Sequence, residues 1–157
     1  MAFIRRTVQS SIFEEFYPTT LAFSAAKKNY FLGHSKDKSY MIYNMTDAGK
    51  IEPTVVVQKG KLKTYLQNIQ AFYDPTQNKQ YLYGYNLDEK VIDVYQIADN
   101  ASIVLMYSEE FNVEDSIKSA TFFIINGVLC FYTQSDKTKS WYILSLIHIS
   151  EPTRRYA

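Results

Sequence analysis

The chain has few of the residues from which catalytic and metal-binding sites are usually built. It contains one cysteine and two histidines among 157 residues. The single cysteine, Cys130, excludes an internal disulfide framework. Phosphate-binding glycine loops, zinc-ligand spacings and calcium loops are also missing from the sequence. We therefore predict no catalytic residue, no metal and no cofactor, and we lean against an enzyme.

Long apolar runs and an excess of one charge are missing as well. No apolar stretch approaches the roughly eighteen residues of a membrane-spanning helix, so we expect no transmembrane segment. The start, "MAFIRRTVQSS", lacks the apolar core of a signal peptide, but this leaves the compartment open. The formal net charge is only +1, and the basic residues form no stripe, which argues against nucleic-acid binding.

Aromatic residues are what the chain has in excess. It contains 14 Tyr and 10 Phe, against one Trp and 5 Gly. Tyr and Phe favour pleated, half-buried surfaces, so this composition favours β structure. The hydrophobic content of 46% is high enough to predict a folded core rather than a disordered chain.

A repeat of about fifty residues runs along the chain. The stretches 21–45, 70–97 and 121–144 align with one another. The aligned positions are Phe23, Phe72 and Phe122; Phe31, Leu82 and Leu129; and Tyr43, Tyr95 and Tyr142. We infer one supersecondary unit that is repeated about three times.

Turn signals divide each repeat into short strands. The second repeat predicts strands at 69–74, 80–86, 91–97 and 103–109. In the third repeat the first turn shortens to Asn126-Gly127, a strong signal for a two-residue hairpin in which both positions take positive φ.

This four-stranded meander resembles a β-propeller blade across roughly residues 17–143. The double glycine of kelch repeats and the Gly-His and Trp-Asp pairs of WD repeats are missing, so the resemblance is to the architecture alone. It implies an all-β fold, a partial propeller of about three four-stranded antiparallel blades; a β-sandwich is the alternative. The expected units are the end of a preceding blade (1–16), two blades (17–66 and 67–116) and a truncated blade (117–143).

The last residues, 144–157, resemble a sequence of a different origin. Residues 144–154, "LSLIHISEPTR", match the translation, in one frame, of the transposon mosaic-end adapter used in tagmentation sequencing libraries. We therefore interpret 144–157 as an adapter artefact, which also removes His148 from any candidate site. The alternative is that the apolar residues of this tail form the fourth strand of the third blade.

Few side chains suggest a binding site. Comparison of the repeats assigns His34 and Cys130 to packing, and Asp37 and Asp136 to turns. Aromatic residues beside the turns are able to stack on a sugar. The candidate ligand-contact residues are Trp141, Tyr40 and Tyr85.

The predicted function follows from the propeller resemblance. We expect a non-catalytic binding or scaffold module, a fragment of a larger β-propeller that recognises a protein or a carbohydrate and contacts the missing blades of its own full-length chain. The alternative is a fragment of a propeller enzyme, of glycoside hydrolase or lyase type, whose catalytic residues lie in missing blades. Inward-facing Asp, Glu, Arg or Tyr residues at the starts of the inner strands in several further blades would favour the enzyme.

The adapter interpretation makes a direct prediction about the gene. We expect an unamplified genomic read across codons 140–157 to diverge from the given sequence at or near codon 144. The adapter interpretation would be contradicted by a genomic read that encodes residues 144–154 with codons different from those of the adapter.

Overall fold

The computed structural model describes residues 8–9, 13–111 and 117–148, and within these ranges every regular element is a β-strand. The strands are β1 (Thr19–Ala25), β2 (Lys28–His34), β3 (Ser39–Met45), β4 (Ile51–Lys61), β5 (Asn68–Asp74), β6 (Lys79–Asn86), β7 (Val91–Ile97), β8 (Ile103–Glu110), β9 (Ile117–Ile125), β10 (Val128–Ser135) and β11 (Trp141–His148).

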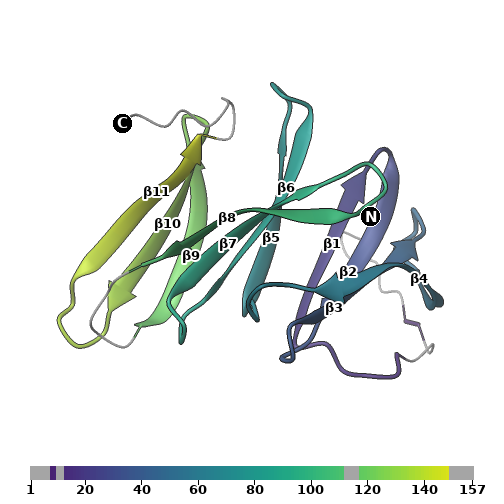
Figure 1. Cartoon of the computed structure of the whole chain (residues 1–157), viewed down its shortest axis with the longest axis horizontal. Coiled ribbons are helices and arrows are strands. Elements are labelled where there is room, and N and C mark those ends of the chain that lie inside the picture. Colours follow the sequence, from purple (N-terminus) through teal and green to yellow (C-terminus); the bar gives the residue numbers. More distant parts are fainter. Residues whose placement is uncertain (1–7, 10–12, 112–116, 149–157) are drawn as a thin grey trace, which may run out of the picture.

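The strands form three antiparallel meanders that follow one another along the molecule (Figure 1). The first sheet has the order β1-β2-β3-β4, the second β5-β6-β7-β8 and the third β9-β10-β11. Each strand pairs only with its neighbours in sequence, and no strand crosses from one sheet to another. This all-β arrangement is consistent with part of a propeller-like fold.

The second sheet is buried on both faces because a sheet packs against each of them. Leu82 and Tyr95 face the first sheet, whereas Tyr83 and Val94 face the third. The core between the first two sheets also contains Phe23, Tyr30, Leu32, Ile42, Leu62, Leu66 and Ile69. The core between the second and third sheets also contains Tyr81, Ile92, Phe111, Ile117, Phe122, Leu129 and Phe131.

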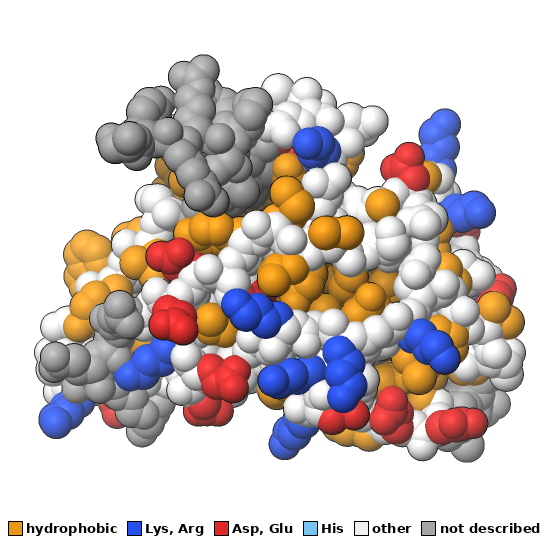
Figure 2. All heavy atoms as spheres, viewed as in Figure 1, with side chains coloured by type: hydrophobic (Ala, Val, Ile, Leu, Met, Phe, Trp, Pro, Cys, Tyr) orange, Lys and Arg blue, Asp and Glu red, His pale blue; other side chains and the backbone are white. Residues whose placement is uncertain are grey.

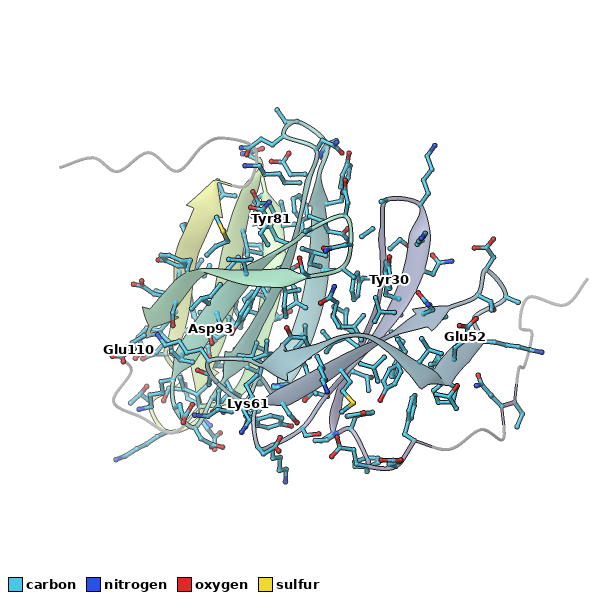
Figure 3. All side chains as sticks on the ribbon, turned by 45° about the vertical axis from the view of Figure 1, so that its right-hand side comes forward. Tyr30, Glu52, Lys61, Tyr81, Asp93 and Glu110 are labelled. Carbon is cyan, nitrogen blue, oxygen red and sulfur yellow. The ribbon has the colours of Figure 1, made fainter. Side chains whose placement is uncertain are left out.

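The outer strands and the charged side chains mark the surface of this stack. Most side chains of β4 and β8 are half-buried or exposed. In Figure 3, Tyr30 lies on the side of the first sheet nearest the second, and Glu52 lies at the opposite end, on β4. Figure 2 shows hydrophobic side chains in the middle of the molecule, with charges of both signs along its lower part.

Two hairpins have two-residue turns with positive φ at both positions. Asn126 and Gly127 have φ of 52° and 73°, as the sequence predicts. Ala26 and Lys27 form an equivalent turn between β1 and β2, with φ of 49° and 66°. Alanine and lysine have no side chain that favours this conformation, so the sequence did not predict this turn.

The third sheet differs from the predicted alignment. Phe31 pairs with Tyr43 and Leu82 pairs with Tyr95, but Leu129 pairs with Ile147 rather than with Tyr142. The tail also differs from its alternative interpretation, because residues 144–148 continue the third strand, β11, and form no fourth strand. A bulge between Leu129 and Cys130 shifts the pairing with β11 at this point.

The turn at Ala26-Lys27 stores strain that glycine would relieve. We expect Lys27→Gly to raise the free energy of unfolding by roughly 1 kcal/mol, because a non-glycine residue is penalised at left-handed φ. The matched control is Lys28→Gly, which places glycine in β2 and should lower stability by roughly 0.5–1 kcal/mol. Urea denaturation measures the free energy of unfolding of both variants. A change of the same sign in the two variants would contradict the presence of strain at this turn.

Candidate functional site

The outer face of the first sheet, on the side away from the second sheet, carries a cavity of about 740 Å³. Two carboxylates, two phenols and several apolar side chains form its wall. The lining residues are Glu14, Glu15, Tyr17, Met41, Tyr43, Pro53, Thr54 and Val56. They come from the segment that precedes β1 and from strands β3 and β4. The cavity is thus built on a single sheet and on the chain that enters it.

A chain of hydrogen bonds orders the phenols at the base of this cavity. The Tyr43 hydroxyl donates to Sδ of Met41 at 3.3 Å, and it also bonds the Tyr17 hydroxyl. Because the single Tyr43 proton is directed to sulfur, the Tyr17 hydroxyl is the donor to Tyr43. Burial raises the pKa of Tyr17, and the hydrogen bond to Tyr43 raises it further. Tyr17 therefore stays protonated at neutral pH and does not act as a general base.

Close aromatic packing fixes the position of the segment before β1. The Phe13 ring stacks on Phe31 with centroids 5.7 Å apart, and it lies 5.0 Å from the Tyr43 ring. The Tyr17 ring lies so close to the backbone of Gly33 that a Cβ at position 33 would collide with it. Glycine at this position is what permits the approach.

The three ligand-contact candidates lie in different parts of the molecule. Tyr40 packs against the core between the first and second sheets. Tyr85 packs against Phe122 and Phe131, in the core between the second and third sheets. Trp141, at the start of β11, is 64% exposed and is the one candidate whose ring is largely open to solvent.

His34 has a structural environment. It is fully buried at the end of β2, and its Nε2 accepts a hydrogen bond from the backbone N–H of Leu66 at 3.0 Å. Its Nδ1 therefore carries the proton and donates to the carbonyl oxygen of Ser39 at 2.9 Å. Burial lowers the pKa of His34, which keeps the ring neutral. Nε2 thus joins the first sheet to the chain that enters the second, and Nδ1 holds the ring to β3 within the first sheet.

The aspartates of the turns also have local partners. The Asp37 carboxylate accepts hydrogen bonds from Oγ of Ser39 at 2.6 Å and from its backbone N–H at 3.0 Å. These bonds lower the pKa of Asp37. Asp136 forms an exposed ion pair with Lys139 at 3.3 Å. Both contacts stabilise turns.

Asp93 is a buried carboxylate that the sequence analysis did not consider. It lies in β7, its Oδ1 accepts a hydrogen bond from Ser108 at 2.6 Å, and its Oδ2 has no hydrogen-bond partner among the described residues. One acidic residue in the mostly apolar strand "VIDVYQI" was the signal for it. In the parts of the chain that the structure describes, no three His, Cys, Asp or Glu side chains come together as a metal site would require.

Comparisons with known proteins show no family for this chain. No family model and no curated protein matches it. Among solved structures, the crystal structure of a protein from Lactobacillus plantarum is similar, with a TM-score of 0.43 and 10% identity. The match covers 82% of this chain and 41% of that one, so the chain spans less than half the length of the structure it resembles.

Within residues 8–9, 13–111 and 117–148, no helix is long and apolar enough to cross a bilayer.

The buried His34 predicts a pH dependence of stability. Its pKa is lowered in the folded state from 6.5, so below this pH the unfolded chain binds a proton that the folded chain does not. We expect the melting temperature to fall as the pH is lowered from 7.5 to 5.5, a range that extends about one pH unit on either side of the ordinary histidine pKa. The His34→Gln variant should be less stable overall, and its melting temperature should depend less on pH over this range. An unchanged pH dependence in this variant would contradict its assignment to His34.

Proposed function

We propose that the chain is a non-catalytic binding or scaffold module, an arc of a larger β-propeller that recognises a protein or a carbohydrate. The observation that carries this proposal is the second sheet, which is covered on both faces by equivalent meanders. Such stacking is the construction principle of propellers, in which each blade buries the faces of its neighbours. Sheets stacked in this way hold their rim loops rigidly, and loops on a rigid scaffold are the usual carriers of binding function.

The hydrogen bonds of His34, Asp37 and the two cavity phenols support a non-catalytic role, although side chains of these types often act in catalysis. Both nitrogens of His34 are occupied by backbone groups. The Asp37 carboxylate is bonded within its own turn, and the phenols of Tyr17 and Tyr43 bond each other. His34 and the two phenols contribute to the fold through these partners, and Oδ1 of Asp37 stabilises its own turn.

A binding assay paired with a turnover assay tests the proposal. We expect the full chain to bind a component of a glycan array or of an immobilised protein panel saturably, and to release no product from aryl glycosides or uronic-acid polymers. For a carbohydrate ligand, Trp141→Ala should weaken binding by about tenfold, since a stacked aromatic ring contributes about 1–1.5 kcal/mol. Tyr85→Phe is the control and should leave the affinity unchanged. Turnover of a substrate by the purified chain would contradict the proposal.

A further inference from the structure

The segment that precedes the first sheet repeats the segment that precedes the second. Residues 8–17 read "VQSSIFEEFY" and residues 57–66 read "VQKGKLKTYL", with the same Val-Gln start. In the structure both glutamines bond to the backbone of a later segment. Gln9 accepts from the N–H of Ile51 at 3.0 Å, and Nε2 of Gln58 donates to the carbonyl of Asn100 at 3.1 Å. Both bonds span 42 positions in sequence.

The ends of these two segments also take equivalent positions. Tyr17 lies over Gly33 of the first sheet, and Leu66 lies over Gly84 of the second. Leu66 is fully buried because the first sheet covers it. The outer face of the first sheet is thus equivalent to the face of the second sheet that packs against the first sheet. The cavity beside Tyr17 lies where a covering sheet would pack.

The third sheet also has an open face, but on the other side of the stack from the open face of the first sheet. Its inner face, with Phe131 and Leu144, packs against the second sheet. Residues that alternate with these point the other way, and Ile125, Trp141 and Ile143 are 55%, 64% and 48% exposed. This outer face of the third sheet is therefore equivalent to the face of the first sheet that packs against the second sheet.

From these two faces we infer that the chain self-associates head to tail, with the open face of the third sheet in one copy covering the open face of the first sheet in a second copy. The contact between the first and second sheets already shows how these two kinds of surface meet, with Leu32 and Ile42 packed in one core with Leu66 and Leu82. A second copy carries both kinds of surface and so offers each open face a partner.

The two faces differ from each other, so the interface is heterologous. Such an interface closes into a ring or extends into a filament. Two copies of three sheets each would supply six sheets, which is within the range of about four to eight blades in closed propellers. The inference rests on the propeller arrangement proposed above and not on the identity of any ligand.

Single-face variants test this arrangement. Val56→Lys places a charge in the wall of the first-sheet cavity, and Ile143→Lys places one on the open face of the third sheet; both side chains are partly exposed. Val104→Lys, at a 61% exposed position on the outer strand β8, is the matched control. Light scattering after gel filtration and sedimentation velocity give the mass of each protein across a concentration series.

We expect the native chain and Val104→Lys to form dimers or larger assemblies. Val56→Lys alone and Ile143→Lys alone still have one good face each and should be monomers, because a heterologous contact needs both faces. A mixture of the two single variants is the sharper test. Val56→Lys carries an intact third-sheet face and Ile143→Lys an intact first-sheet face, so an equimolar mixture should form a one-to-one dimer that grows no further. The single tryptophan, Trp141, gives a second readout, since its emission should shift to shorter wavelength on association.

Three results would overturn the inference. These are a native chain that stays monomeric at high concentration, a homodimer that persists in either single-face variant, and a mixture of the two variants that stays monomeric while the native chain associates. Circular dichroism spectra like that of the native chain establish that the variants are folded. Failure of the ligand-binding assay leaves these masses unaffected, so the two proposals fail separately.

Discussion

The packing of one sheet against the next is the interaction on which the rest of this structure depends. Hydrogen bonds hold each meander together, but a single sheet of this size leaves its apolar faces in water. Leu82 and Ile92 lie on opposite faces of the second sheet, and both are fully buried because both faces are covered. Burial of each such side chain contributes about 1.5–3 kcal/mol.

Polar contacts add specificity to this apolar packing. His34 joins the end of β2 to the N–H of Leu66, at the point where the chain passes from one sheet to the next. The Tyr95 hydroxyl accepts a hydrogen bond from the N–H of Lys63 at 2.8 Å in the same connection. These bonds satisfy backbone groups that would otherwise be buried without partners, and they fix how the second sheet is placed against the first.

Local patterns were sufficient to predict the strands, but not the register of the third repeat. The run 91–97 is β7 to the residue, and Asn126-Gly127 forms the expected hairpin. Alignment by residue type matched Leu129 with Tyr142, whereas Tyr142 pairs with Thr133 and Leu129 pairs with Ile147. The bulge at Leu129/Cys130 shifts the pairing by a single residue, so most of this difference comes from aligning Leu129 too early in the strand. The cavity beside Tyr17 was also missed, since it depends on which sheet face is left uncovered.

The strictly sequential pairing of the strands has a consequence for folding. Every ladder joins strands that are adjacent in the chain, so contacts within a sheet close only short loops and their entropic cost is low. During synthesis, a complete sheet is available as soon as β4 has left the ribosome. The apolar face of this first sheet stays uncovered until β5–β8 have been synthesised. A nascent chain of this kind is therefore most prone to aggregation between the completion of the first sheet and that of the second.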